Sequence, residues 1–384
     1  MANKTPNKKL RVGILGATGM VGQRFISLLE NHPWFEVTVV AASPRSAGKK
    51  YIDAVAGRWS INKPSSECGS GCSSELGQWV QRSEMPNFVR NLVVYDVNDV
   101  EQIKKQVDFV FSAVDMTKDE IRAIENKYAE NDIPVVSNNS AHRWTPDVAM
   151  IIPEINPHHA EMIPMQRKNH GWKKGFIVVK PNCSIQSYMP VIAPLMKFNP
   201  KRMVITTMQS ISGAGKTFET YPDIADNVIP FIGGEEEKSE KEPLKILGSI
   251  KNGNFVDFEG MKISAHCNRT PTSDGHMATV SIEFEKKPTR EEILKAWKGY
   301  KPVPQQLGLP SAPDPVLIYR EEENRPQTRL DRDAGKGMAI SIGRLRPCNV
   351  FDYRFVALSH NTVRGAAGGA ILVAELLYKK GYLG

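Results

Sequence analysis

No stretch of the sequence approaches the roughly 18 consecutive apolar residues that a membrane-spanning helix needs, so the pattern predicts no membrane span. Residues 1–10 are polar and lysine-rich, and the apolar stretch that follows, 12–15, is too short for the core of a signal peptide. Internal repeats and low-complexity tracts are absent as well. We therefore predict a cytoplasmic protein without a membrane partner.

Cysteine is scarce, with five residues in a chain of 384. An odd number in a chain of this length does not suggest a disulfide framework and favours a reducing compartment. Cys68 and Cys72 lie in a Ser/Gly-rich stretch with no histidine or second cysteine pair nearby, which makes them a weak zinc candidate. We predict no metal site.

Charge of one sign does not dominate, although lysine and arginine exceed aspartate and glutamate by 50 − 42 = 8. The basic residues are scattered, and no nucleic-acid-binding motif accompanies them, so we predict no nucleic-acid partner. The excess fits a solvated surface and a cationic site for an anionic substrate. With 41% hydrophobic and 24% charged residues, the composition is that of a globular protein of two or three domains.

The order of apolar segments changes along the chain. In the first half, short valine-rich segments alternate with helical stretches, which predicts a parallel, doubly wound sheet. After about residue 200 the predicted strands are longer and the helices fewer. The fold class expected is α/β, with a Rossmann-like doubly wound parallel sheet followed by a second, α+β domain. The predicted strands are 10–15, 35–42, 92–95, 108–112, 133–137 and 176–179, then 203–209, 261–265, 277–284, 338–345 and 353–359.

Glycines recur across the first predicted strand–helix junction, at Gly13, Gly16, Gly19 and Gly22. Small residues there let the backbone approach a pyrophosphate, and the helix N-terminus supplies N–H donors. The spacing departs from the usual G-x-G-x-x-G, and the alternative is a tight turn without a ligand. The residues predicted to contact the dinucleotide are Gly16, Ala17, Thr18, Gly19, Met20 and Val21.

The end of the second predicted strand indicates the type of cofactor. NAD enzymes usually place an acidic residue there, but this sequence has Ser43, Arg45 and Ser46 and no acid before Asp53. A guanidinium pairs with the 2′-phosphate that a carboxylate would repel. We therefore predict NADP, the alternative being that Arg45 is an ordinary solvated loop residue.

The segment Pro181-Asn182-Cys183-Ser184 follows a predicted strand and precedes a predicted helix. A helix N-terminus favours the thiolate form of a cysteine, which is the form a nucleophile needs. A small core residue is the alternative interpretation of Cys183. The segment 210–217 imitates a P-loop, but Ser210 stands where that motif requires glycine, so we predict no nucleoside-triphosphate site.

Four further segments carry residues of the same chemistry. Gln209 ends a predicted strand, Glu235 and Lys238 are three residues apart in a stretch, 233–241, that we predict to be a charged loop, and Arg269 and His276 are seven apart. Arg143 lies in Ser140-Ala141-His142-Arg143. Together with the glycine-rich turn and the segment 360–369, these motifs resemble the aspartate-semialdehyde dehydrogenase family, particularly its archaeal and fungal branch, over nearly the whole chain.

The resemblance implies a role for each matching residue. Cys183 would be the nucleophile, His276 the general acid/base, and Gln209 would position the acyl group. Arg269 would bind the substrate carboxylate, Glu235 its amino group, and Lys238 and Arg143 its phosphate. Asn361 would lie near the nicotinamide. Asn182 is predicted among the substrate-binding residues, and the chemistry alone makes the N–H of Asn182 or Cys183 a candidate oxyanion donor.

The family's fold would return the last helix to the cofactor domain. It implies an NADP-binding, Rossmann-like domain 1–181 (completed by 361–384) and a second α+β domain, 182–360, for catalysis and dimerisation or higher oligomerisation. The implied reaction is the reversible, NADP-dependent reduction of aspartyl phosphate to aspartate semialdehyde, by a homodimer or homotetramer, in lysine, methionine and threonine biosynthesis. A malonyl- or succinyl-CoA reductase and a catalytically silent NADP-binding regulator remain as alternatives. The polar stretch between Arg58 and Asn91 departs from the family's pattern.

Overall fold

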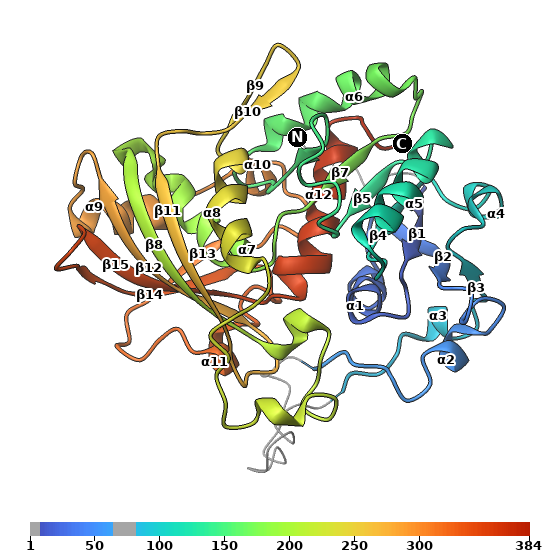
Figure 1. The fold of residues 1–384 in the computed structure, drawn as a ribbon, viewed down its shortest axis with the longest axis horizontal. Coiled ribbons are helices and arrows are strands. Elements are labelled where there is room, and N and C mark those ends of the chain that lie inside the picture. Colours follow the sequence, from blue (N-terminus) through green and yellow to red (C-terminus); the bar gives the residue numbers. More distant parts are fainter. Residues whose placement is uncertain (1–7, 64–81) are drawn as a thin grey trace.

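Two β-sheets and the helices around them form the protein in the computed structural model, which describes residues 8–63 and 82–384 (Figure 1). Cys68 and Cys72, the weak zinc candidate, lie outside the described residues. Within the described ranges, no helix is both long and apolar enough to cross a bilayer.

The first sheet has seven strands in the order β3-β2-β1-β4-β5-β7-β6, and every neighbouring pair is parallel. Strands β4, β5 and β7 are buried along their whole length, as expected for a sheet covered on both faces. This confirms the predicted doubly wound sheet. The strands are β1 (Leu10–Leu15), β2 (Phe35–Ala42), β3 (Val94–Asp96), β4 (Phe109–Ser112), β5 (Val135–Ser137), β6 (Ala149–Met150) and β7 (Ile177–Val179).

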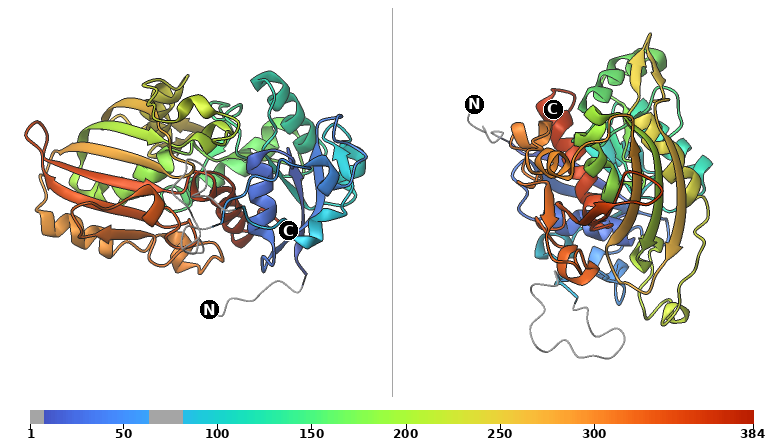
Figure 2. Two further views of the ribbon diagram at one scale, coloured as in Figure 1. Left: turned by 90° about the horizontal axis from the view of Figure 1, so that it is seen from below. Right: turned by 90° about the vertical axis from the view of Figure 1, so that its left-hand side faces the viewer.

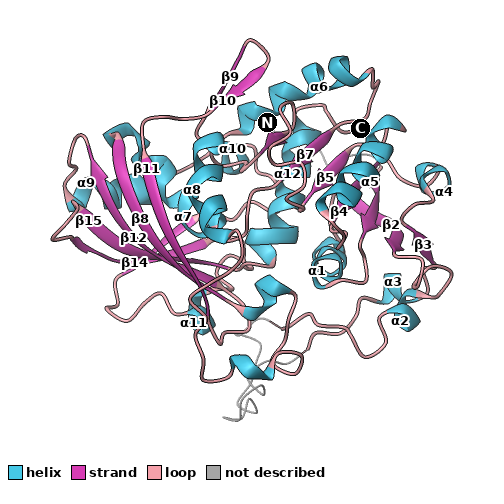
Figure 3. Cartoon of the chain, viewed as in Figure 1, coloured by secondary structure: helices cyan, strands magenta, loops and turns pink. Residues whose placement is uncertain are grey.

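The second sheet is mixed and has six strands in the order β11-β8-β12-β15-β14-β13 (Figure 3). Burial alternates along β12, which has one face against the core, as its sequence predicts. The strands are β8 (Pro200–Gln209), β11 (Lys262–Arg269), β12 (His276–Phe284), β13 (Leu317–Arg320), β14 (Ile340–Pro347) and β15 (Tyr353–Ser359), with a separate hairpin of β9 (Ser249–Lys251) and β10 (Asn254–Val256).

Helices cover the first sheet and join it to the second. A capping box of Thr117 and Glu120 starts one of them, in which each residue bonds the backbone N–H of the other. The helices are α1 (Met20–Leu29), α2 (Tyr51–Ala54), α3 (Asn87–Arg90), α4 (Val100–Lys104), α5 (Lys118–Glu130), α6 (Ile163–His170), α7 (Ile185–Ile192), α8 (Glu235–Ile246), α9 (Arg290–Lys298), α10 (Val303–Gln306), α11 (Thr328–Asp331) and α12 (Gly368–Lys379).

The last helix, α12, lies between the two sheets (Figures 1 and 2). Its residues from Ala370 to Leu377 are buried, and they share a core cluster with the first sheet and α1. The helix begins at Gly368, after a helical turn at Val363–Ala367 that is broken at Ala366. The predicted boundary between domains at residues 181 and 182 falls between β7 and α7 and stays a prediction.

The expectation that 233–241 is a loop is wrong, because α8 begins at Glu235. Gly234 precedes the helix in the left-handed conformation (φ 69°), and three glutamates occupy its first turn. Negative charges at a helix N-terminus are stabilising, so a run of charge that suggested a solvated loop is instead a helix start. The strands β6, β9, β10 and β13 are additions to the predicted set.

Candidate active site

Cys183 lies between the end of β7 and the start of α7, with Ser184 as the residue before the helix. The chain turns from a buried strand into the helix within a few residues, so Cys183 sits at the N-terminal end of α7, as predicted. Its side chain is only partly exposed. The sulfur, Sγ, lies 3.3 Å from Nε2 of His276.

His276 begins β12, and its ring is completely buried. The backbone N–H of Ser210, which follows β8, donates to Nδ1 of the ring at 3.1 Å. Because Nδ1 accepts this hydrogen bond, it carries no hydrogen in the neutral ring. The ring hydrogen is therefore on Nε2, which faces the sulfur of Cys183. Burial, with Arg269 as the next cause, lowers the pKa of His276 to about 3, so the ring is neutral near pH 7.

Glu235 is the centre of a buried group of polar side chains. Nδ2 of Asn182 lies 2.9 and 3.0 Å from its two oxygens, and Nε2 of Gln209 donates to it at 3.2 Å. Nζ of Lys238, one helical turn along α8, donates at 2.8 Å. Burial favours a raised pKa for Glu235, but Lys238 and then Gln209 outweigh it and hold the pKa below its usual value. Glu235 is therefore an anion facing the nucleophile's segment.

Arg269 ends β11, beside β8, and its guanidinium donates to the carbonyl of Ser210 at 2.6 Å. Gly213, in the short helical turn Ile211–Ala214, lies against both Arg269 and His276. A Cβ at Gly213 would come within 2.9 Å of the His276 ring and 3.0 Å of the Arg269 guanidinium. The glycine of the P-loop-like segment therefore leaves room for the candidate site.

Arg143 reaches the site from the loop after β5. Its guanidinium pairs with Glu242 of α8 at 2.8 Å and donates to the carbonyl of Lys180 at 3.2 Å. A cavity of about 250 Å³ is lined by both residues predicted to bind phosphate, Arg143 and Lys238, and by Lys118 and Lys241. Neither of those two lysines forms an ion pair with the described residues, and the four basic side chains of the cavity outnumber its two carboxylates, Glu237 and Glu242.

The suggestion that the backbone N–H of Asn182 is an oxyanion donor is wrong for this geometry. That N–H donates to Glu242 at 2.7 Å, and the side-chain amide is committed to Glu235. The N–H of Cys183 makes no hydrogen bond to the described residues, so it remains a candidate oxyanion donor. Asn182 instead ties the nucleophile's segment to α8.

The glycine-rich turn has the geometry of a phosphate cradle. Gly16 adopts φ 79°, and a Cβ there would lie 2.2 Å from the carbonyl of Ala113. Gly19 precedes α1, whose first turn has neither a capping side chain nor an acidic residue. A helix N-terminus free of side-chain caps at the carboxyl edge of a parallel sheet is suited to a pyrophosphate. These features fit a dinucleotide along Gly16–Val21, the predicted contact.

The loop after β2 places Arg45 at the same edge of the first sheet. Its side chain is exposed and forms no ion pair with the described residues. Ser43 and Ser46 close a turn around it, through a bond from the Ser46 N–H to the Ser43 carbonyl at 2.9 Å. The position suits a cation that binds the cofactor's 2′-phosphate, and the role of these residues stays a prediction.

Asn361 links the last helical segment to the catalytic strands. Its oxygen accepts the N–H of Gly275 at 2.8 Å, and its amide donates to Ser212 at 2.9 Å. Gly275 directly precedes His276, so Asn361 helps to place the histidine. Its expected contact with nicotinamide stays a prediction.

Three buried polar residues around the site were not predicted from the sequence: Glu242, Lys245 and Lys180. The first two continue a spacing of three or four residues from Glu235 and Lys238, which puts all four on one side of α8. That spacing could have identified Glu242 and Lys245. Lys180 directly follows the apolar strand β7, which is an unusual place for a buried lysine.

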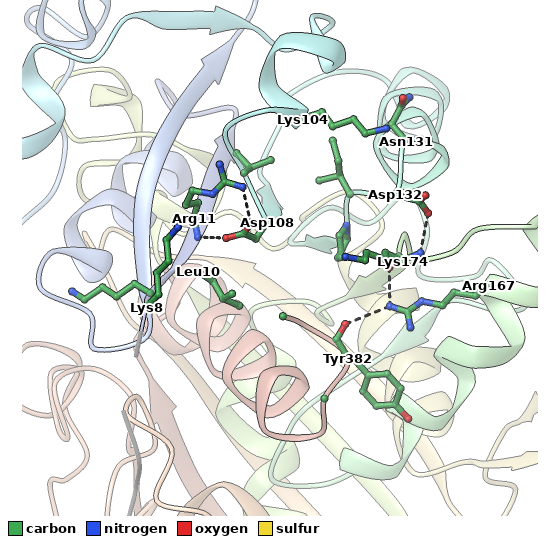
Figure 4. A pocket seen from close by; sticks show the side chains of 16 residues that line it. Lys8, Leu10, Arg11, Lys104, Asp108, Asn131, Asp132, Arg167, Lys174 and Tyr382 are labelled. Carbon is green, nitrogen blue, oxygen red and sulfur yellow. Dashed lines mark hydrogen bonds and ion pairs between the residues drawn. The ribbon is translucent and has the colours of Figure 1, made fainter. Parts of the chain in front are cut away.

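A second cavity, of about 510 Å³, lies at the opposite edge of the first sheet, where β1, β4 and β5 begin (Figure 4). Arg11 there pairs with Asp108 at 2.8 Å, and Arg167 donates to the carbonyl of Tyr382. No predicted site residue lines this cavity. Parallel sheets bind their ligands at the carboxyl ends of the strands, so it is not the candidate active site.

Two family models match the chain. Residues 11–163 match the NAD binding domain of semialdehyde dehydrogenase, and residues 192–364 match the dimerisation domain of semialdehyde dehydrogenase. The two matches cover most of the first sheet, without β7, and the whole of the second sheet.

Relatives match along the whole length. The chain is 44% identical to the aspartate-semialdehyde dehydrogenase of Archaeoglobus fulgidus, over 96% of this chain and 98% of the relative. It is 43% identical to that of Aspergillus fumigatus, over 98% and 99%. The solved structure of the Candida albicans enzyme with NADP has a TM-score of 0.83 and 37% identity, covering 98% of this chain and all (100%) of that one.

Proposed function

The chain belongs to the aspartate-semialdehyde dehydrogenase family, and we propose that it catalyses the reversible, NADP-dependent reduction of aspartyl 4-phosphate to aspartate 4-semialdehyde through a cysteine thioester. The observation that carries this proposal is the 3.3 Å contact of Cys183 Sγ with His276 Nε2, with Glu235 and Arg269 beside it. The family's reaction needs this combination of nucleophile, proton donor and charges for a small zwitterion.

Cys183 begins the reaction as a thiolate. Its sulfur attacks the acyl carbon of aspartyl phosphate, the C–S bond forms, and the bond from that carbon to the phosphate oxygen breaks. Phosphate leaves toward the cavity lined by Arg143 and Lys238. The free N–H of Cys183 is placed to stabilise the oxyanion that develops during the attack.

His276 holds the proton that the second half of the reaction requires. NADPH, when bound, supplies the hydride that reduces the thioester. The Nε2 hydrogen faces the sulfur, so it lies next to the carbon attached to that sulfur and can protonate the oxygen on it. When the thiohemiacetal collapses, its hydroxyl proton returns to Nε2 of His276, the C–S bond breaks, and the aldehyde leaves the Cys183 thiolate behind.

Charges around Cys183 match the parts of aspartyl phosphate. The Arg269 guanidinium suits the α-carboxylate, and the buried Glu235 carboxylate suits the α-amino group. Lys118 and Lys241 add unpaired positive charge to the phosphate cavity, where Arg143 and Lys238 are already bonded to carboxylates. A malonyl or succinyl group also offers a carboxylate to Arg269 but has no amino group, so the buried charge of Glu235 would have no substrate partner.

A single assay tests the proposed function. The purified protein is given NADPH with aspartyl phosphate, malonyl-CoA or succinyl-CoA in parallel. We expect oxidation of NADPH with aspartyl phosphate alone. Efficient reduction of either acyl-CoA, together with inactivity toward aspartate semialdehyde and phosphate, would assign the chain to the acyl-CoA reductases instead, and inactivity with all substrates would favour the silent regulator.

Replacing Arg45 with alanine is expected to weaken NADPH binding roughly tenfold or more and to leave NADH binding nearly unchanged. A charge-assisted hydrogen bond to phosphate contributes about 1.5–3 kcal/mol, and NADH lacks that phosphate. Dissociation constants of both cofactors, measured from the change in nucleotide fluorescence on binding, check the result. An equal loss for the two cofactors would show that Arg45 does not bind the 2′-phosphate.

Replacing Glu235 with glutamine is expected to raise the KM for aspartate semialdehyde by roughly 10- to 100-fold, because the substrate ammonium loses a charged partner of about 1.4–3 kcal/mol. Glu237→Gln is the matched control, since Glu237 lies on the same helical turn but is exposed. Its KM for aspartate semialdehyde should stay close to that of the wild type. A similar rise in both variants would mean that the KM for aspartate semialdehyde depends on the total negative charge of the first turn of α8, and not on a direct contact with Glu235.

The assembly and location follow the family. The dimerisation domain indicates that the chain associates with copies of itself, and a homodimer or homotetramer is the proposed state. Light scattering of the purified protein distinguishes the two, and a monomer at micromolar concentration would contradict both. The proposed location is the cytoplasm, and the proposed role is in the biosynthesis of lysine, methionine and threonine.

A further inference from the structure

Gln23 ties the glycine-rich turn to the chain that follows α2. It is a buried residue of α1, 2% exposed, and its amide donates to the carbonyl of Thr18 at 2.9 Å. The oxygen of the same side chain accepts the backbone N–H of Ser60 at 2.8 Å. One buried side chain therefore holds the predicted dinucleotide contact and the segment 58–62 together.

Asn62 connects this segment to the second sheet. The chain after α2 runs toward that sheet (Figure 1), and Nδ2 of Asn62 donates to the carboxylate of Asp274 at 2.6 Å, although the two residues are 212 apart in the sequence. Asp274 lies between β11 and β12 and is 2% exposed. A cavity of about 20 Å³ is lined by both residues and by Met20, the first residue of α1. The hydrogen bond therefore joins the two parts of the molecule next to the glycine-rich turn.

Arg82 decides which end of the Asn62 amide faces Asp274. Its guanidinium donates to Oδ1 of Asn62 and, at 3.1 Å, to the carbonyl of Ser60. Because a guanidinium can only donate, the oxygen of Asn62 must face Arg82 and the nitrogen must face Asp274. The donor that Asp274 receives is therefore fixed by a second side chain.

The carboxylate of Asp274 depends on this donor. Within residues 8–63 and 82–384, Asn62 is the one group that donates a hydrogen bond to it, since Arg332 donates to the backbone carbonyl of Asp274 instead. Burial favours a raised pKa for Asp274, but His360, Arg24 and Arg332, together with the bond from Asn62, hold the pKa below its usual value. A buried anion is costly to leave without a hydrogen bond, so loss of Asn62 should displace Asp274.

A displacement of Asp274 would reach the catalytic histidine through one residue. Gly275, between Asp274 and His276, adopts φ 98°, and its N–H donates to Asn361 at 2.8 Å. β12 then begins at His276, whose Nε2 lies 3.3 Å from Sγ of Cys183. A misplacement of a catalytic group by about 1 Å can cost about 10²-fold in rate. The position of the Asp274 carboxylate therefore matters for the contact between His276 and Cys183.

We propose that Asn62 is a positioning residue for the catalytic histidine, whose hydrogen bond to Asp274 holds His276 beside Cys183 at a fixed place relative to the glycine-rich turn. The printed sequence offers no motif for this role, because the contacts run from Gln23 through Asn62 to Asp274 and cross the two sheets. The inference rests on the proposed function, in which His276 donates the proton. It adds a residue that touches neither the substrate nor the nucleophile.

Asn62→Ala is the first test. We expect kcat with aspartate semialdehyde and phosphate to fall by about 10- to 100-fold, because His276 is displaced. The KM for phosphate should stay close to that of the wild type, since Asn62 does not line the cavity of Arg143 and Lys238. The Kd for NADPH should also stay close, since the bonds of Gln23 remain. A loss of NADPH binding as large as the loss of kcat would overturn the proposal.

A double-mutant cycle with His276→Gln separates positioning of the histidine from general support of the fold. If Asn62 acts through His276, the Asn62→Ala change should lower kcat in the wild-type background and alter it by less than about twofold in the His276→Gln background. Equal losses in the two backgrounds would show that Asn62 does not act through the histidine, and the proposal would be wrong.

The same cycle has a readout that needs no turnover. Iodoacetamide alkylates Cys183 as the thiolate, which a hydrogen bond from His276 favours, and mass spectrometry measures the rate. Asn62→Ala should slow the alkylation severalfold in the wild-type background and leave it unchanged in the His276→Gln background. An unchanged rate in Asn62→Ala itself would overturn the proposal. Because this assay uses no substrate, failure of the proposed function and failure of this inference are distinguishable.

Asn98→Ala is the matched control. Nδ2 of Asn98 also donates to an aspartate, Asp96, at 2.9 Å, but this pair is exposed and lies in the turn after β3. Its loss should change neither kcat nor the alkylation rate. A loss in Asn98→Ala equal to that in Asn62→Ala would mean that removal of any such hydrogen bond disturbs the protein, which would contradict the proposal.

Asn62→Asp gives a second variant at the same position. Asn62 is partly exposed, so the change in charge should be tolerated by the fold. The new carboxylate has no hydrogen to donate near pH 7 and would face the carboxylate of Asp274. We therefore expect kcat to fall at least as far as in Asn62→Ala. A kcat close to that of the wild type would show that the donated hydrogen bond is not needed, and would overturn the proposal.

Discussion

Cys183→Ser is expected to abolish turnover, with a loss of several orders of magnitude in kcat, while NADPH still binds. A serine hydroxyl in the same place is a far poorer nucleophile than a thiolate, and removal of a covalent nucleophile usually costs this much. The measurement is the formation of NADPH from aspartate semialdehyde and phosphate. Retention of more than about a tenth of the wild-type rate would exclude Cys183 as the nucleophile.

Cys348→Ser is the control for this substitution. Cys348 is a free cysteine that follows β14, and its N–H bonds the carbonyl of Asp352 away from the site. Its replacement should leave the rate unchanged. A loss in both variants would point to a general sensitivity of the fold to serine, and thermal denaturation would then separate stability from chemistry.

His276→Gln is expected to lower kcat by about 10²- to 10⁴-fold and to change the KM for substrate much less. The histidine donates its proton during the reaction rather than holding the substrate, so the loss appears in the transition state. Steady-state kinetics in both directions measure the effect. An unchanged kcat with a raised KM for substrate would show that His276 binds the substrate and takes no part in the chemical step.

His266→Gln provides the comparison for His276. His266 lies in β11, which neighbours β8 on the side away from β12, and it is exposed. The kcat of the His266→Gln variant should match that of the wild type.

Local pattern accounts for much of what the sequence predicts about the fold. Valine-rich segments such as Phe35–Ala42 are strands, because β-branched residues suit a sheet buried on both faces. Stretch 233–241 was predicted incorrectly, because its charge density suggests a solvated loop. In the structure, the same glutamates stabilise a helix start, and Glu235 faces inward toward Asn182 and Gln209. Burial of a charged side chain depends on distant partners that no local pattern reveals.

The sequence by itself determined most of the order of elements, the glycine-rich turn and Cys183 as a candidate nucleophile, because each depends on residue type and near neighbours. His276 became a candidate through the resemblance to the family. The tertiary structure alone decided that these two side chains lie 3.3 Å apart, since they are 93 residues apart in the chain. It also decided that Ser210 fixes the histidine's hydrogen on Nε2 and that Asn62 donates to the buried Asp274. Tautomers, burial and long-range hydrogen bonds are properties of the assembled environment, which only the packing of both sheets around α12 creates.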